Sequence, residues 1–263
     1  MLANKKLLIT GVVDTASIAY AITRRCLGHG AVVVLTAPPR DLDRATAVAA
    51  DLDLGVIELD ATNPDATNSD DWTNATGAIA ERWGHLDGAV HAIAYAPASA
   101  LHGTMLDADP DGLSIAFQTS VASYAWLGRL LNDLAPPTGA SLVGFDFDAS
   151  RAWPTYNWMG VCKAALEAMN QYLARDLAAT NTRSNLIAAG PLATRAASGI
   201  PGFDLFLDAW EHQAPLDWDP TDPTPTADAA CFLLSDLSRA TTGEILHVDA
   251  GFHAMATVLP PTT

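Results

Sequence analysis

The chain has 263 residues, a formal net charge of −16 at pH 7 and a hydrophobic content of 49%, enough to bury one large core. This acidity argues against nucleic acid or an anionic membrane as a partner. No apolar run reaches the length of about 18 residues that a membrane-spanning helix requires. The three cysteines are scattered and the N-terminus lacks the pattern of a signal peptide, so we expect a reduced, cytoplasmic protein.

Short apolar runs that read as strands alternate with amphipathic segments along the whole chain. We expect strands at 6–10, 31–36, 55–59, 86–92, 141–145, 183–188 and 244–248. Helices are expected at 18–29, from the Pro38-Pro39 pair to about 52, and at 70–83, 113–134, 157–179 and 227–234. This alternation implies right-handed crossovers and a parallel sheet covered on both faces. We therefore predict the α/β class: a single doubly wound Rossmann-type domain over 1–263, with a parallel seven-stranded sheet.

The first turn between a strand and a helix has a single glycine, Gly11, and carries Ser17 where a second small residue would let a pyrophosphate approach. In sheets of this kind, ligands bind beyond the carboxyl ends of the strands. Ser17 could cap the helix and donate its hydroxyl to a phosphate beside the free N–H groups of the helix start. An ordinary capped turn has the same pattern, so both interpretations stay open.

The ends of the next strands give weaker indications. The end of the second strand, residues 36–40, lacks the acidic residue that usually holds an NAD ribose, and Arg40 could face either a 2′-phosphate or solvent. Asp60 is placed either to touch an adenine ring or to cap a helix. After the fourth strand, Ala92 and Ala94 would let the backbone approach a ribose or nicotinamide, or they reflect tight packing.

Tyr156 and Lys163 are seven residues apart, which is two helical turns, so their side chains are predicted to share one face of a helix. A phenol and an ammonium in that arrangement can donate hydrogen bonds to a developing oxyanion. Lys163 is also the only lysine beyond Lys6. From the spacing alone, a surface lysine beside a tyrosine at a helix start is the competing interpretation.

The segment at about 195–213 begins with small residues and then becomes apolar, with Phe203, Leu205, Phe206 and Trp210. This pattern favours a lid over an apolar substrate, although a buried or partner-facing surface helix would look the same. Just before it, the Gly190-Pro191 turn is followed by Leu192 and Thr194, which could meet a carboxamide. The seven histidines show no metal-ligand spacing and no cysteine pair suggests zinc, so we predict no metal site.

Three motifs together resemble the enoyl-acyl carrier protein reductases of type II fatty-acid synthesis, in the short-chain dehydrogenase/reductase superfamily. They are Gly11-x5-Ser17-Ile18-Ala19, Tyr156-x6-Lys163 and Ala189-Gly190-Pro191, and the resemblance extends over essentially the whole chain. The run at 144–159 is similar to the actinobacterial branch. Other members of the superfamily carry Tyr-x3-Lys with an upstream Ser; Gly160 and Val143 stand at those positions here, which disfavours ketoreductase or alcohol dehydrogenase chemistry.

The resemblance implies hydride transfer from NADH to C3 of a trans-2-enoyl thioester carried by acyl carrier protein, in a homotetramer. It implies catalytic roles for Tyr156, Lys163 and Phe147, and substrate contacts by Tyr95, Met159 and Tyr156. Cofactor contacts are implied for Gly11, Val13, Ser17, Ile18, Asp60, Ala61, Ile93, Ala94, Lys163, Leu192 and Thr194.

Two departures from the family limit what the resemblance implies. The segment at 199–212 is shorter than in the mycobacterial enzyme for long acyl chains, so we expect a shorter preferred chain. It also contains no Lys or Arg to meet an acidic carrier protein, and Arg195 is the nearest candidate. A coenzyme A thioester, a related reductase of a specialised lipid or polyketide pathway, and a catalytically silent nucleotide-binding Rossmann protein stay open as alternatives.

Overall fold

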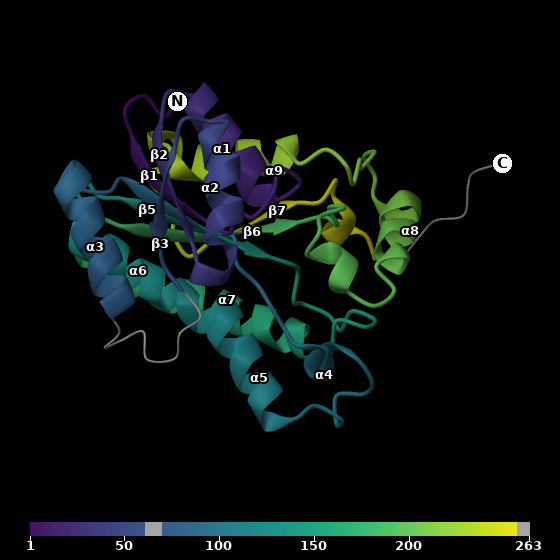
Figure 1. Cartoon of the computed structure of the whole chain (residues 1–263). Coiled ribbons are helices and arrows are strands. Elements are labelled where there is room, and N and C mark those ends of the chain that lie inside the picture. Colours follow the sequence, from purple (N-terminus) through teal and green to yellow (C-terminus); the bar gives the residue numbers. More distant parts are fainter. Residues whose placement is uncertain (61–69, 257–263) are drawn as a thin grey trace.

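The computed structural model describes residues 1–60 and 70–256 and is built on one parallel sheet (Figure 1). Its seven strands lie in the order β3-β2-β1-β4-β5-β6-β7, which confirms the predicted α/β class and parallel seven-stranded sheet. The strands are β1 (Lys6–Thr10), β2 (Val32–Ala37), β3 (Gly55–Glu58), β4 (Gly88–His91), β5 (Ser141–Asp146), β6 (Arg183–Ala189) and β7 (Ile245–Val248).

Helices cover both faces of the sheet because its strands are apolar on both sides. On one face, Leu7 and Ile9 of β1 pack with α1 (Ile18–Gly28) and α9 (Thr224–Leu234), and α2 (Leu42–Ala50) joins this layer. On the other face, Leu8 packs with α3 (Asp70–Trp83), α6 (Ser123–Leu134) and α7 (Asn157–Asp176). Figure 1 shows the two helical layers on opposite sides of the strands.

The order of the strands reverses at β1, which pairs with β2 on one side and with β4 on the other. The crossover connections leave this point in opposite directions, so the loops after β1 and β4 diverge and leave room for a ligand. The carboxyl ends of β4, β5 and β6 lie side by side on the same edge, because His91 pairs with Gly144 and Asp146 with Ala188.

The helix predicted at 113–134 begins earlier and is not regular. Asp109 caps its start by accepting a hydrogen bond from Gly112 N at 2.7 Å, and Pro110 occupies the first turn. The α-helical part α5 (Pro110–Phe117) is followed by a π-helical stretch, Gln118–Ala122, before α6 continues. A wider turn of this kind is common near functional sites.

Several other boundaries also differ from prediction. Two helices were not predicted as such, α4 (Ala98–Leu101) and α8 (Asp204–Gln213), and α9 starts at Thr224 rather than 227. The helix after Pro38-Pro39 ends at Ala50, and α7 ends at Asp176 with one 3-10 turn, Leu177–Thr180, beyond it. Within the described residues, no helix is long and apolar enough to cross a membrane.

Candidate active site

Tyr156 lies immediately before α7, at the end of the loop that follows β5, and its side chain is only 8% exposed. Its neighbours Thr155 and Asn157 both have left-handed backbones, with φ of 61° and 39°. Such backbones are costly and persist only where surrounding contacts hold them. The Thr155 hydroxyl donates to Pro201 O, and Asn157 Nδ2 donates to Leu101 O at 2.8 Å. These contacts fix the phenol between α4 and the segment that leads into α8.

Lys163 follows two turns into α7 and is 6% exposed. Its Nζ donates to Phe145 O at 2.6 Å, so one of the three ammonium donors anchors the side chain to β5 and two remain. Burial lowers the pKa of Lys163, and the neighbouring Asp146 carboxyl acts in the opposite direction. Burial also raises the pKa of the Tyr156 phenol, so the hydroxyl stays protonated at neutral pH and can donate a hydrogen bond.

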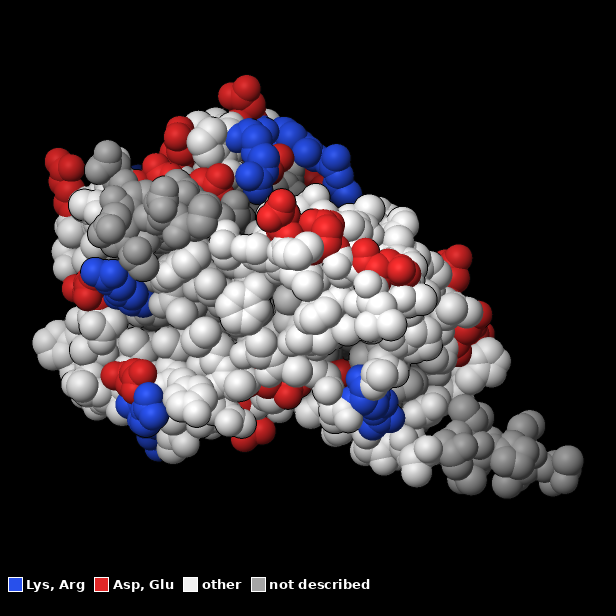
Figure 2. Space-filling model, turned by 90° about the horizontal axis from the view of Figure 1, so that it is seen from below, with Lys and Arg blue, Asp and Glu red and all other residues white. Residues whose placement is uncertain are grey.

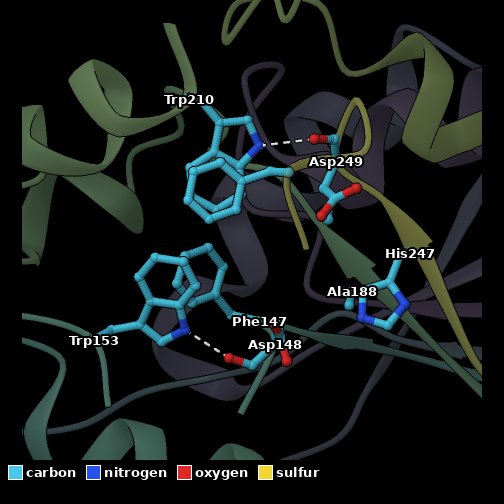
Figure 3. A pocket seen from close by; sticks show the side chains of 9 residues that line it. Phe147, Asp148, Trp153, Ala188, Trp210, His247 and Asp249 are labelled. Carbon is cyan, nitrogen blue, oxygen red and sulfur yellow. Dashed lines mark hydrogen bonds between the residues drawn. The ribbon is translucent and has the colours of Figure 1, made fainter. Parts of the chain in front are cut away.

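Phe147 connects this pair to the segment predicted as a lid. Its ring centroid lies 5.3 Å from that of Tyr156 and 5.5 Å from that of Phe206 on α8. Trp153 and Trp210 complete the cluster (Figure 3), with centroids 4.8 and 5.8 Å from Phe147. The space between these rings and the ends of β5, β6 and β7 does not admit a water molecule. Phe147 is therefore packed against a box of aromatic rings and is partly exposed.

Trp210 fastens α8 to the C-terminal end of the sheet. Its indole stacks on Phe252 with centroids 3.8 Å apart and planes 6° apart. Its Nε1 donates to Asp249 O at 3.0 Å (Figure 3). Phe206 and Trp210 of the 195–213 segment are thus buried, and Phe206 packs in the same cluster as Tyr156 and Met159, whereas Leu205 is exposed.

The turn after β1 brings two strand ends into contact. Gly11 has φ of +86°, and a Cβ there would lie 2.1 Å from Ala92 O, just beyond β4. Only glycine fits this approach. Ser17 caps α1, since its Oγ accepts from Tyr20 N at 3.2 Å and donates to Asp14 O at 2.8 Å. Ser17 is therefore the N-cap of α1, and the start of this helix lies next to the point where the strand order reverses.

Comparison with known proteins identifies the family. The sequence profile described as "Enoyl-(Acyl carrier protein) reductase" matches residues 11–253. The chain is 38% identical over 266 residues to an NADH enoyl-[acyl-carrier-protein] reductase of Mycobacterium avium, covering 95% of this chain and 97% of the relative. The chain belongs to the enoyl-acyl carrier protein reductase family.

Further relatives support the assignment of the chain to this family. The NADH enoyl-[acyl-carrier-protein] reductase FabI of Aquifex aeolicus is 37% identical over 257 residues, covering 97% of this chain and 93% of the relative. A solved structure of the enoyl reductase from Anaplasma phagocytophilum, in complex with NAD, superposes with a TM-score of 0.89. That comparison covers 98% of the reductase and 97% of the other chain, at 34% identity.

The other residues predicted to bind cofactor line the strand ends of the reductase. Val13 lies in the turn after β1, Ile18 is the first residue of α1, and Ile93 and Ala94 lie in the loop after β4. Leu192 is buried after β6, and Thr194 Oγ1 accepts from Ala197 N at 3.2 Å. Ala61 lies outside the described residues.

Arg40 has acidic neighbours in the reductase. Its Nη1 lies 3.6 Å from Asp60 Oδ2 and its Nε 3.6 Å from Asp41 Oδ2. Sequence reasoning treated Arg40 and Asp60 as separate candidates and missed that they meet. The charge of Arg40 is thereby balanced at the place where a 2′-phosphate would need it.

Among the substrate candidates, Met159 is buried beside Tyr156, whereas Tyr95 is 56% exposed. The backbone of Tyr95 is fixed by Ser120 of the π-helical stretch, whose Oγ accepts from Tyr95 N at 3.1 Å and donates to Tyr95 O at 3.2 Å. Ser120 was not predicted, because its role depends on the wider helical turn.

Sequence reasoning also missed two buried polar groups, His91 and Asp146. His91 Nε2 lies 2.7 Å from Ser123 Oγ, and burial lowers the pKa of the ring to about 3, so it is neutral. Asp146 ends β5 beside Lys163, and burial raises the pKa of its carboxyl to about 7. The described residues contain no group of three or more His, Cys, Asp or Glu side chains that could hold a metal ion.

Proposed function

We propose that this reductase saturates the trans-2 double bond of enoyl thioesters with NADH, using Tyr156, Lys163 and Phe147 as its catalytic residues. The observation that carries the proposal is the buried pair of Tyr156 and Lys163 beside Phe147, at the carboxyl end of β5. A silent nucleotide-binding protein would have no use for a buried, protonated phenol next to a buried ammonium.

NADH supplies the hydride that is added to C3 of the substrate. Tyr156 donates a hydrogen bond to the thioester carbonyl oxygen, which gains negative charge as the enolate forms, and this preference for the transition state lowers the barrier. Lys163 orients the nicotinamide ribose with its two remaining donors, and its charge favours the enolate. A proton added at C2 completes the saturated thioester.

The residues present fit a dinucleotide without a 2′-phosphate. Gly11 and Ser17 shape the start of α1 for a pyrophosphate, and we assign the adenine contact to Asp60. Because Arg40 lies between Asp41 and Asp60, it offers little net positive charge to a 2′-phosphate. This arrangement supports NADH over NADPH.

The acyl end of the site is bounded by Met159, Tyr95 and the lid at 195–213, within a single Rossmann-type domain over 1–263. The lid segment is compact and its aromatic residues fill the space above Phe147. We infer a preference for short or medium acyl chains. Arg195, exposed at the start of the lid, is the only Lys or Arg within residues 195–213, and we assign it the contact with a carrier protein.

We further infer a homotetramer in a reducing, cytoplasmic compartment. The face seen in Figure 2 carries α5 and α7, and charged residues are sparse over its middle. Large apolar side chains are exposed on these two helices: Ile115, Phe117, Val161 and Tyr172. Such surface is typical of subunit contacts. All three cysteines are buried free thiols, which supports a reducing compartment.

The test follows NADH absorbance with trans-2-enoyl thioesters of several lengths, each offered on acyl carrier protein and on coenzyme A. We expect oxidation of NADH that is faster than that of NADPH and greatest at short or medium chain length. No oxidation of either cofactor with any thioester would refute the proposal. Lys163→Ala should weaken NADH binding in a fluorescence titration, and an unchanged affinity would refute the ribose role.

A further inference from the structure

The buried carboxyl of Asp146 has no role in the reaction described above. The side chain is only 5% exposed, and neither of its oxygens accepts a hydrogen bond within the described part of the chain. A buried carboxylate in this state is costly, because it has lost its water without gaining donors. Such a group either takes up a proton or pairs with a nearby charge.

The helix α7 presents both an ammonium group, on Lys163, and a carboxyl group, on Glu167, near Asp146. Lys163 Nζ bonds the carbonyl of Phe145, the residue directly before Asp146, at 2.6 Å. Glu167 lies one turn further along α7, and its Oε1 accepts from Ala149 N at 3.1 Å. Lys163 therefore holds the chain just before Asp146, at Phe145, and Glu167 holds it just after, at Ala149. Lys163 and Glu167 are four residues apart and share one face of α7.

The charges around Asp146 act in opposite directions. Burial raises the pKa of its carboxyl to about 7, Lys163 acts to lower it, and Glu167 acts to raise it further. Tyr156, just before α7, and Cys162 on α7 also face this group of residues, and His91 faces Lys163 from β4. From the neighbouring strand β6, the residue paired with Asp146 is the uncharged Ala188.

We propose that Asp146 is a positioning residue that carries one exchangeable proton and, through Lys163, sets the charge presented to the nicotinamide end of the cofactor. This inference rests on the proposed role of Lys163 at the nicotinamide ribose. With the proton present, Lys163 is an uncompensated positive charge. With the proton lost, Asp146 and Lys163 form a neutral pair.

The protonation state of Asp146 should affect the binding of NAD⁺ and NADH differently, because the nicotinamide ring is positively charged only in NAD⁺. An uncompensated Lys163 repels that ring, whereas an ionised Asp146 relieves the repulsion. The ratio of the Kd for NAD⁺ to the Kd for NADH should therefore fall as the pH rises through about 7. For a change of one unit charge near the ring, we expect a fall on the order of tenfold. Loss of the proton would favour hydride transfer in the same way, since the ring gains charge in that step.

The experiment measures both Kd values between pH 5.5 and 9, by NADH fluorescence and by displacement of NADH with NAD⁺. The wild-type ratio should change about tenfold, with a midpoint near 7. Asp146→Asn preserves the shape of the side chain and should make the ratio independent of pH. Glu167→Gln keeps an oxygen for Ala149 N and should move the midpoint to lower pH, because it removes the carboxyl that raises the pKa of Asp146.

A flat wild-type ratio, or an Asp146→Asn ratio that still changes like the wild type, would overturn the inference. If Asp146→Asn does not fold, an unmoved midpoint in Glu167→Gln would overturn it as well. The proposed function fails separately, because that failure would appear as the absence of NADH oxidation by enoyl thioesters, whatever the ratio of the binding constants.

Discussion

Replacing Trp210 by Ala tests whether α8 is fastened to the sheet as described. The indole is buried, stacks on Phe252 and donates to Asp249 O. Removal of a buried tryptophan costs about 3–5 kcal/mol of unfolding free energy, and the abandoned Asp249 carbonyl would add to this cost. Because α8 lies at the surface and can relax, we expect the lower end, about 3 kcal/mol, or a fall in Tm on the order of 10 °C.

The assay is thermal unfolding followed by circular dichroism, with Leu205→Ala as the matched control. Leu205 lies on the same helix but is exposed, so its truncation should cost less than about 0.5 kcal/mol. Equal losses in the two variants, or a loss below about 1 kcal/mol for Trp210→Ala, would refute the proposed anchoring. The loosened helix should also raise kcat/KM for long enoyl thioesters relative to short ones, whereas Leu205→Ala should leave that ratio unchanged.

Three further predictions concern the cofactor turn, cofactor choice and assembly. Gly11→Ala should abolish NADH binding and lower Tm, because its Cβ would overlap Ala92 O; a fluorescence titration with wild-type affinity would contradict this. Asp60→Asn should strengthen NADPH binding several-fold at low salt, because it removes one of the two carboxylates beside Arg40, and an unchanged NADPH Kd would count against that ion pair. Phe117→Asp should shift the protein to smaller species in size-exclusion chromatography, since Phe117 is exposed on α5; an unaltered elution volume would exclude this surface from the assembly.

The sheet was predictable because its strands are buried on both faces and read as short apolar runs. Each of the seven expected strands is present, with shifts of one or two residues at their ends. The irregular helix from Pro110 was harder to predict. Its start depends on the Asp109 cap, and the π-helical stretch at Gln118–Ala122 leaves no trace in the apolar periodicity. The helix α8 was not predicted as a helix, because its buried residue Phe206 packs on a cluster formed by segments that are distant in the sequence.

For the site, spacing was enough to place Tyr156 and Lys163 together near the end of β5. Asp146 was overlooked, although a charged residue at the carboxyl end of an apolar strand is itself a signal of a functional group. Glu167, four residues after Lys163, was the second available signal. The contact between Arg40 and Asp60 could not be predicted, because it joins the ends of two different strands through their loops.

The most direct test of the central claim compares the wild type with Tyr156→Phe in the oxidation of NADH by a trans-2-enoyl thioester. The substitution removes only the buried hydroxyl, so NADH should bind with unchanged Kd. We predict that kcat falls on the order of 100-fold, as expected when an oxyanion donor is lost. Wild-type kcat in Tyr156→Phe would contradict the assignment of the phenol as the group that stabilises the enolate.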